Sequence, residues 1–464
     1  MASARALSFI LPSPTGQEVL AVRDPGGWTL PACEDPTADE YSLGESYFFN
    51  GLFRARYGLD VHTRYVVEQR DPPAAAFVLE AHSSDPTPPA DARWVAPADL
   101  HLPAGTPPWM HGAVAAALSD ASPSRTMPWS RPGGLDEPIA WLHEQLDTLG
   151  IGAGGHPEQV SNAYVSCVLR CATDAGDVYL KLLPPLYNRE LEILRALGEW
   201  GIAPTPEVLA LDAEHRRLLM RDMGGYDLGE TTDLDVWEDA VRELARLQRA
   251  SMPFVADPAA TPLHDWRVPV MRQSLDGLVE AVTPLLAGCR YSLSKHEQSL
   301  LRAALPGLRN LCREIEDYGI APAIEHGDLH GANIRVTPGG PVVYDWAWSA
   351  VSHPFLSLDS LLHTQRRWLA TTEGARARLR DAYLAAWSDC GTMEGLRSLF
   401  DGVDRLKTLY YVLADAAWLR DVHSILGDHR PVPFSADAWT LGRRRHYLAK
   451  SVRRLLPVAG ESAE

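Results

Sequence analysis

The segment 324–346 holds two aspartates and an asparagine in an order that is typical of a catalytic site. Asn333 follows Asp328 by five residues, and Asp345 follows Asn333 by twelve. One carboxylate can accept the proton of an attacking hydroxyl group, and an Asn with a second carboxylate can bind Mg²⁺, which prefers oxygen ligands. Phosphoryl transfer from a nucleotide uses these three groups in this order. The spacing therefore predicts a phosphotransferase site.

This stretch resembles the aminoglycoside phosphotransferase family, a branch of the protein-kinase-like fold. The His-Gly-Asp triplet ending at Asp328 stands where protein kinases have His-Arg-Asp, and Asp345-Trp346 stands where they have Asp-Phe-Gly. Both differences point to the branch that acts on small molecules. The resemblance implies that Asp328 is the catalytic base, that Asn333 and Asp345 bind Mg²⁺, and that His326 supports the loop.

The alternative is a turn rich in Asn, Asp and Gly that joins two strands, in which Asp328 only caps the backbone. Turn chemistry does not fix a three-part spacing of this kind, so we favour the phosphotransferase interpretation.

The resemblance implies an α+β protein with the two-lobed protein-kinase-like fold. A β-rich N-lobe is expected at residues 137–225 and an α-rich C-lobe at residues 226–464, with helices near 234–251, 268–286 and 293–318. The resemblance covers roughly residues 150–450.

Lys181 lies in the apolar segment 178–183 of the N-lobe, which predicts a strand. A Lys inside such a strand is unfavourable unless its ammonium group finds a partner or reaches solvent. In the family the equivalent Lys grips the nucleotide phosphates and pairs with a Glu on the next helix. Glu190 shares a helical stripe with Leu194 and Leu197, so we predict Glu190 as that partner. The alternative is a Lys that extends to solvent beside an ordinary charged helix.

The nucleotide-binding loop is the weakest part of the pattern, because residues 161–164 contain no glycine. The small-molecule branch tolerates such loops, so Ser161 and Asn162 are predicted to donate hydrogen bonds to phosphate. The segment 218–225 resembles the hinge that meets adenine, with Met220 and Met223 as its contacts.

After the catalytic loop, the segment 352–359 resembles the family's Gly-x-Pro-x-x-Asp-Leu sequence, and Asp359 is predicted to anchor the loop backbone. The resemblance also implies that the later helices line the acceptor pocket. Asp415 and Asp421, near Trp418, are candidates for an acidic, aromatic lining, although most aromatic side chains in this region are expected in the core.

Residues 1–119 resemble a Nudix domain in the sequences at 26–31, 56–59 and 94–100. Nudix hydrolysis depends on a helix with an Arg-Glu pair followed by a Glu-Glu pair. The corresponding places here hold Gly51, Leu52, Ala55 and Arg56, so we predict no such hydrolysis. Residues 120–136, rich in Pro, Ser and Gly, are predicted to be a linker.

Composition narrows the function further. Of the 464 residues 46% are hydrophobic and 22% are charged, which is typical of a globular chain. The net charge of −17 argues against nucleic acid or an anionic membrane as the main partner. Six cysteines suggest no disulfide framework, no run is long enough to span a membrane, and the apolar start is too short for a signal peptide. Together with a requirement for ATP, these features favour the cytoplasm.

The sequence therefore predicts a Mg²⁺-dependent kinase that moves phosphate from ATP or GTP to a small hydroxylated acceptor. An antibiotic, sugar, nucleoside or amino alcohol all remain open as acceptors, and so does the oligomeric state. The competing hypothesis is a nucleotide-binding pseudokinase whose N-terminal domain recruits a partner. The complete Asp328, Asn333 and Asp345 set argues against it.

Overall fold

The computed structural model describes residues 6–33, 43–70, 73–119, 127–163, 165–185, 189–257, 261, 263–426 and 436–456. Helices and strands are mixed as predicted for the α+β class. Two compact units form: residues 1–186, 209–222 and 422–442 make the first, and residues 187–208, 223–421 and 443–464 make the second. None of the described helices is both long and apolar enough to cross a lipid bilayer.

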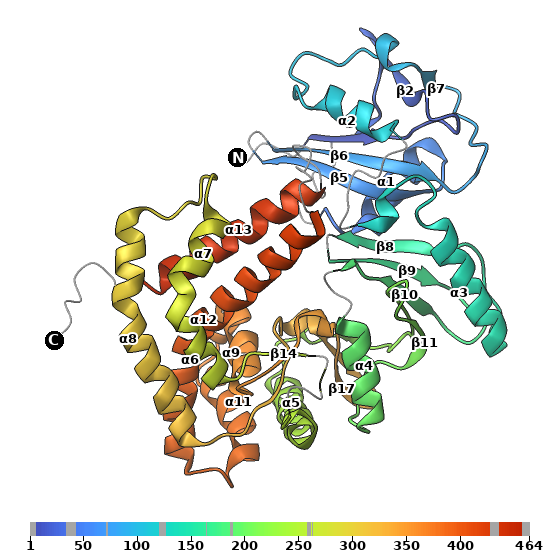
Figure 1. Cartoon of the computed structure of the whole chain (residues 1–464). Helices are drawn as coiled ribbons and strands as arrows, with labels where there is room; N and C mark the ends of the chain where they lie inside the picture. The colour runs from blue at the N-terminus through green and yellow to red at the C-terminus, as the bar shows by residue number, and fades with distance from the viewer. Residues whose placement is uncertain are drawn as a thin grey trace. The chain divides into compact units, whose positions relative to one another are not determined.

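In the described N-terminal part of the first unit, the strands form two sheets, which are accompanied by helices α1 and α2 (Figure 1). One sheet has the order β4-β1-β6-β5, and the other has the order β3-β2-β7. The aromatic residues Phe9, Phe49 and Phe77 pack together between α1 and the larger sheet. The elements are β1 (Ala6–Ile10), β2 (Val19–Asp24), β3 (Gly27–Thr29), β4 (Ala32–Cys33), α1 (Ser46–Tyr57), β5 (Val61–Arg70), β6 (Pro73–Ala81), β7 (Ala92–Val95) and α2 (Met110–Ala117).

The rest of the first unit is a five-stranded sheet of order β11-β12-β10-β9-β8, as predicted for the N-lobe. Helix α3 packs on this sheet through Leu142 and Leu146, which share a core with Leu169 and Leu180 (Figure 1). The elements are α3 (Asp136–Leu149), β8 (Glu158–Ala163), β9 (Ser166–Cys171), β10 (Val178–Leu182), β11 (Val208–Asp212) and β12 (Arg217–Arg221).

The second half of the predicted linker belongs to this core. Trp129 and Leu135 are 3% and 1% exposed and pack with the residues under α3. Their apolar side chains explain why residues 127–135 are ordered despite a turn-rich composition. The first half of the predicted linker, residues 120–126, lies outside the described residues.

The second unit is mainly helical, with two small three-stranded sheets of order β13-β16-β17 and β14-β18-β15. Its strands are β13 (Tyr226–Asp227), β14 (His264–Asp265), β15 (Ala323–Glu325), β16 (Ile334–Thr337), β17 (Gly340–Val343) and β18 (Ala350–Ser352). Its helices are α4 (Arg189–Glu199), α5 (Leu234–Val255), α6 (Val268–Ser274), α7 (Leu278–Leu286), α8 (Lys295–Tyr318), α9 (Phe355–Thr364), α10 (Arg366–Leu369), α11 (Ala375–Leu384), most of α12 (Met393–Leu426) and the C-terminal part of α13 (Ala436–Arg454).

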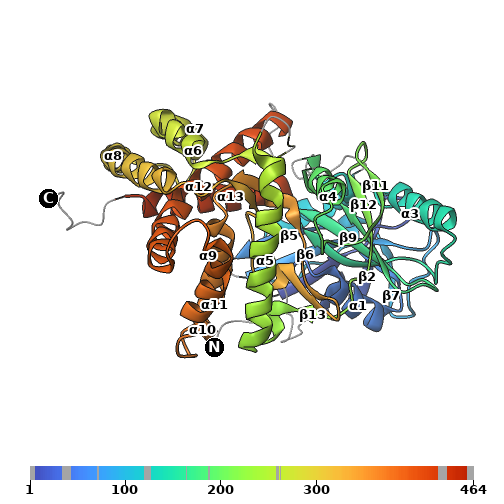
Figure 2. The same ribbon diagram turned by 90° about the horizontal axis from the view of Figure 1, so that it is seen from below.

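Helix ends in this unit follow local capping rules. Ser294 and Glu297 form a capping box at the start of α8, and Gly319 ends the helix in the left-handed conformation. The predicted helix 268–286 is instead divided into α6 and α7, and Gly277 precedes the first residue of α7. Helix α5 packs against α11 (Figure 2), and α5 also contacts β15, so it supports the strand that leads into the predicted catalytic loop.

Candidate active site

The predicted catalytic loop begins where β15 ends and is held by the ring of His326. This side chain is 1% exposed. Its Nε2–H donates to the carbonyl oxygen of Tyr344 at 2.8 Å, and its Nδ1 accepts from the N–H of Asp328 at 3.4 Å. Burial lowers the pKa of His326, which favours the neutral ring that this bonding pattern requires. His326 thus connects the backbone at Asp328 with the residue before Asp345.

Hydrogen bonds bring the three predicted site residues to one place. The side-chain Nδ2 of Asn333 donates to the backbone carbonyl of Asp328 at 2.9 Å. The N–H of Tyr344 donates to the carbonyl of Asn333 at 3.1 Å, so Asp345 follows a residue already tied to Asn333. Asp345 has φ of 62° and ψ of 61°, a left-handed conformation that Asp tolerates better than most residues. Such conformations concentrate at functional sites.

Sequence reasoning missed the groups that fix the start of the loop. The buried Glu325 accepts from the N–H of Gly327 at 3.1 Å, and the hydroxyl of Ser357 donates to its other carboxylate oxygen. The same Ser357 oxygen accepts from the N–H of His326 at 3.2 Å. Burial raises the pKa of Glu325 to about 7, despite these bonds to its charged form. The glutamate immediately before the His-Gly-Asp triplet was the available signal.

Asp359 was predicted to anchor the loop backbone, and the structure corrects this prediction. Its carboxylate is fully buried and contacts Lys407 on α12 and Arg376 on α11 instead. A buried carboxylate needs cationic partners more than it needs a further amide, and these two side chains supply them. Asp359 therefore ties α9 to the later helices.

Asp328 is exposed and lines a cleft of about 610 Å³ in the second unit. Helices α8, α9, α12 and α13 form the other walls. The charged and titratable side chains of the lining are Asp328, His363, Asp404, Arg405, Lys407, Tyr411 and Arg454. Burial and the neighbouring Asp359 raise the pKa of Asp404, so Asp328 and Asp404 differ in environment although both face the cleft. The volume suits a small molecule.

The predicted acidic lining around Trp418 has a different arrangement. Asp415 is buried and accepts a hydrogen bond from Arg444 at 3.2 Å, and its pKa is raised to about 6 by burial. The guanidinium of Arg444 lies 3.9 Å from the ring centre of Trp348 and 5.1 Å from that of Trp418. Asp415 is thus a partner of α13, while Asp421 is exposed on α12.

A family model described as the phosphotransferase enzyme family, APH, matches residues 161–399, which is more than half of the 464 residues. The chain belongs to this phosphotransferase family. It is therefore an enzyme that transfers a phosphoryl group to a hydroxyl acceptor. The match begins at residue 161, so the Nudix resemblance of the preceding region stays a prediction.

Solved structures similar to this phosphotransferase include the choline kinase LicA from Streptococcus pneumoniae, with 15% identity over 68% of this chain and 99% of that chain and a TM-score of 0.42. A macrolide 2'-phosphotransferase type I has 14% identity over 69% and 97% of the two chains and a TM-score of 0.43. The aminoglycoside phosphotransferase APH(3'')-Id from Streptomyces rimosus has 19% identity over 57% and 98% and a TM-score of 0.36. No curated protein matches the chain. The family assignment stands on the sequence match alone.

The residues of the phosphotransferase that were predicted to bind the nucleotide lie on several elements. Lys181 is buried in the middle of β10, between Val168 of β9 and Leu218 of β12. Glu190 is buried in the first turn of α4, which belongs to the second unit, so the pairing of Lys181 with Glu190 stays a prediction. Among the other predicted nucleotide contacts, Ser161 is half-buried on β8, Met220 is half-buried on β12, and Met223 follows that strand.

Asn162 does not fit its predicted role as a phosphate donor. Its Nδ2 donates to the carbonyl oxygens of Thr63 at 2.6 Å and Arg64 at 3.1 Å, and its Oδ1 accepts from the indole of Trp129 at 2.8 Å. The side chain is 5% exposed and its hydrogen-bonding groups are already used. The N-terminal residues that cover β8 were not visible in the local sequence, and they give Asn162 a structural role.

The side chains of Asn333 and Asp345 carry oxygen atoms of the kind that Mg²⁺ prefers as ligands. The bond from Asn333 Nδ2 to Asp328 leaves the side-chain oxygen of Asn333 for a cation, and Asp345 supplies a carboxylate. Nowhere in the described ranges do three or more His, Cys, Asp or Glu side chains gather as a metal site. The predicted ligands, Asn333 and Asp345, offer one amide and one carboxylate, which suits an ion that keeps bonds to water and to substrate phosphates.

Proposed function

We propose that the chain transfers the γ-phosphate of ATP or GTP to a hydroxyl group of an antibiotic, a sugar, a nucleoside or an amino alcohol. The acceptor oxygen forms a bond to the γ-phosphorus, the bond between that phosphorus and the bridging oxygen breaks, and the nucleoside diphosphate leaves. Asp328 receives the proton of the acceptor hydroxyl. Mg²⁺ bound by Asn333 and Asp345 would neutralise phosphate charge.

One observation carries this proposal: Asp328 faces a cleft large enough for the acceptor while its own backbone carbonyl holds Asn333. The proton acceptor and the predicted metal ligand are thus fixed relative to each other by a single hydrogen bond. Positioning of this kind is the main source of rate enhancement when the protein forms no covalent bond to the substrate.

We propose that Lys181 contacts the phosphates and is oriented by Glu190, that Ser161 donates to a phosphate oxygen, and that Met220 and Met223 pack on the base. A Lys in the middle of an apolar strand supports this assignment, because its buried ammonium group requires an anionic partner.

The test is a phosphate-transfer screen with the full-length protein, ATP or GTP, and a panel of hydroxylated antibiotics, sugars, nucleosides and amino alcohols, read by mass spectrometry. One class should gain a phosphoryl group. With that acceptor, Asp328→Asn should lower kcat by about 10²- to 10⁴-fold, the range of a lost general base, and leave nucleotide affinity unchanged.

Asp404→Asn is the matched control, since Asp404 lines the same cleft and the change is the same. It should keep kcat within about threefold and change mainly KM, because a wall residue contributes to binding and not to proton transfer. Nucleotide binding without turnover on any acceptor would favour the scaffold hypothesis. Equal loss of kcat in both variants would contradict the role of Asp328.

A further inference from the structure

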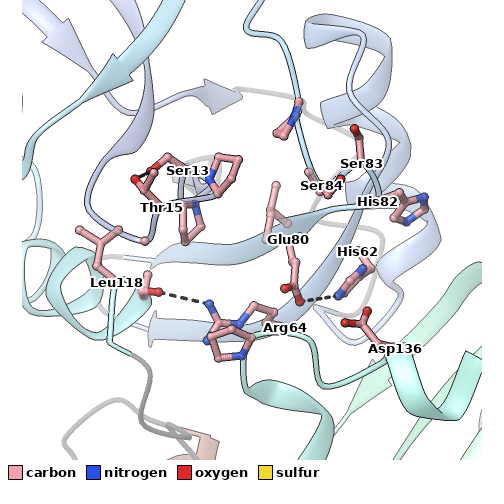
Figure 3. A pocket seen from close by; sticks show the side chains of 18 of the residues that line it. Ser13, Thr15, His62, Arg64, Glu80, His82, Ser83, Ser84, Leu118 and Asp136 are labelled. Atoms are coloured by element: carbon pink, nitrogen blue, oxygen red, sulfur yellow. Dashed lines mark hydrogen bonds and ion pairs between the residues drawn. The ribbon is translucent and has the colours of Figure 1, made fainter.

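A second cavity, of about 420 Å³, lies in the first unit. Its lining comes from the loop after β1, from strands β5 and β6 with the turn that follows β6, and from the segment between α2 and α3 (Figure 3). The volume is within the range of small-molecule sites. None of the residues discussed for phosphoryl transfer contributes to this lining.

Arg64 is the most unusual residue of the lining. It is 2% exposed, and two of its nitrogen atoms donate to backbone carbonyls: Nε to Ser130 at 3.0 Å and Nη1 to Ala117 at 3.2 Å. Its Nη2 has no hydrogen-bond partner among the residues that the structure describes. Both partners are neutral, and Glu80, the carboxylate whose charge acts on Arg64, is paired with His62. An arrangement of this kind is unfavourable unless an anion is added.

The carboxylate next to Arg64 in the cavity already has partners. Glu80 contacts His62 Nε2 at 3.0 Å with one oxygen and accepts from the N–H of Gly133 at 2.8 Å with the other. His62 is 6% exposed, and its Nδ1 has no hydrogen-bond partner within the described chain. Figure 3 shows Arg64 and Glu80 extending into the cavity from neighbouring strands, with His62 beside Glu80. The unsatisfied buried atoms of this lining are therefore nitrogen atoms.

The backbone explains why a guanidinium is directed here. The register between β5 and β6 shifts between Thr63 and Tyr65, so Arg64 has no partner in the ladder. A bulge of this kind changes the direction of the side chain of the extra residue, and bulges are common next to functional sites. In a regular strand, successive side chains would point to opposite faces of the sheet, and Arg64 would pair with a residue of β6.

We propose that this cavity is a second ligand site, which binds a small organic molecule with a phosphate or carboxylate group, and that Arg64 binds that group. Ser13 and Thr15, whose hydroxyl groups are hydrogen-bonded to each other, also line the cavity, and Leu118 and Ile139 offer apolar surface to the uncharged part of the ligand. Asp136 also lines the cavity, but its exposure to solvent screens its charge. The proposal is independent of the reaction proposed above.

The experiment is calorimetric titration of the full-length protein with three probes that share one ring: phenyl phosphate, benzoate and neutral benzyl alcohol. At least one anion should bind saturably, with an affinity at least about tenfold above that of benzyl alcohol, because a charge-assisted bond is involved. The stronger anion identifies the head group. Arg64→Gln should weaken its binding by about tenfold or more.

Because a buried arginine is involved, Arg64→Gln can fail to fold, and Leu118→Trp provides a second variant that fills the cavity from its wall. It should weaken anion binding by at least about tenfold, which is the effect of a lost or blocked contact. Ala115→Trp, exposed on α2 and outside the lining, is its control and should bind the probe normally. The proposal is overturned if neither anion binds, if benzyl alcohol binds as tightly, or if Lys181→Ala abolishes binding while Leu118→Trp leaves it intact.

Discussion

Gly327 is the single residue on which the conformation of the candidate catalytic loop depends most directly. Its φ is +82°, and a Cβ atom placed on it would lie 2.2 Å from the carbonyl oxygen of Trp348. Backbone atoms cannot move aside as a flexible side chain can. We expect Gly327→Ala to destabilise the protein by at least about 2 kcal/mol and to abolish phosphoryl transfer. Chemical denaturation and a turnover assay measure the two effects.

Gly339, in the turn between β16 and β17, is the control for this substitution. A Cβ atom there would lie 3.6 Å from Thr337 Oγ1, an ordinary van der Waals distance. Gly339→Ala should therefore change stability by less than about 1 kcal/mol and leave turnover intact. If both glycine variants behave alike, the close approach of Gly327 to Trp348 is not what holds the loop.

Glu325 should make the stability of the protein depend on pH. Its pKa is about 7 in the folded state, compared with 4.5 for an unperturbed Glu. The folded state then binds more protons than the unfolded state between these values, so this contribution to stability falls as the pH rises from 4.5 through 7. The upper limit of the loss is about 3 kcal/mol.

Denaturant unfolding at pH 5 and pH 8 measures this effect. Glu325→Gln cannot ionise, so the variant should lose less stability than the wild-type protein between the two pH values. Glu314→Gln changes an exposed residue on α8 and should follow the wild-type protein. A wild-type pH dependence that survives in Glu325→Gln would assign the titration to another group.

At this scale the sequence predicted the residues that lie close together along the chain. Asp328, Asn333 and Asp345 belong to one loop-strand-loop segment, so their spacing is visible. The bond between Ser357 and Glu325 joins residues more than thirty positions apart. Buried polar pairs of this kind leave no periodic trace, because either side chain alone looks like an ordinary polar residue.

At the scale of elements, α5 supports the active-site strand through one amide side chain. Gln248 is 1% exposed, and its Nε2 donates to the carbonyl oxygens of Ile324 at 3.1 Å and Pro354 at 2.9 Å. Its Oε1 accepts from the hydroxyl of Tyr383 at 2.6 Å. We expect Gln248→Leu to cost about 3 kcal/mol, since it removes buried hydrogen bonds to the carbonyls of Ile324 and Pro354 and to the hydroxyl of Tyr383. Urea unfolding measures the loss.

A double-mutant cycle with Tyr383→Phe tests whether this bond contributes as argued. In the presence of Gln248→Leu the tyrosine hydroxyl has lost one of its two acceptors, so removing it should cost about 1 kcal/mol less than in the wild-type protein. Additive effects would show that the two side chains do not act together.

Helix positions could be predicted from apolar periodicity, and α5 and α8 lie close to their expected ranges. The arrangement of α13 could not be predicted. Arg444 belongs to a basic run whose ordinary interpretation is a solvated helix face, but it lies between Trp348 and Trp418. Trp348 comes from the segment after Asp345, about a hundred residues earlier, and sequence spacing carries no information on such a contact.

At the scale of the whole molecule, the N-terminal residues give side chains of β8 a structural role. Gln159 and Asn162 both reach across to β5, where Thr63 receives a hydrogen bond from each. The sequence predicted an N-terminal domain and a nucleotide loop as separate parts. The sequence could not show that residues of the N-terminal domain contact β8, the strand that leads into the predicted nucleotide loop. Such packing depends on surfaces that form only after folding.

Two neighbouring substitutions separate the structural role of Asn162 from the nucleotide-binding role that sequence assigned to it. Asn162→Leu should destabilise the protein by about 3 kcal/mol, because it removes the hydrogen bonds that Asn162 makes with the Arg64 carbonyl and the Trp129 indole and one of the two that the Thr63 carbonyl accepts, while nucleotide affinity changes little. Ser161→Ala should do the reverse. Thermal unfolding and ATP titration on both variants give the comparison. A loss of ATP affinity confined to Asn162→Leu would restore the original assignment.

The hydrogen bonds between β8 and β5 are unequal on their two sides. On β8 they come from the side chains of Gln159 and Asn162, whereas on β5 they reach the N–H and carbonyl groups of Thr63 and the carbonyl of Arg64. Main-chain groups are the same whatever residue bears them. Substitutions at positions 63 and 64 would therefore leave these hydrogen bonds intact, whereas almost any substitution at position 159 or 162 would remove them. In related chains that share these hydrogen bonds, we expect the amide side chains at positions 159 and 162 to be retained, and we expect no such restriction at positions 63 and 64.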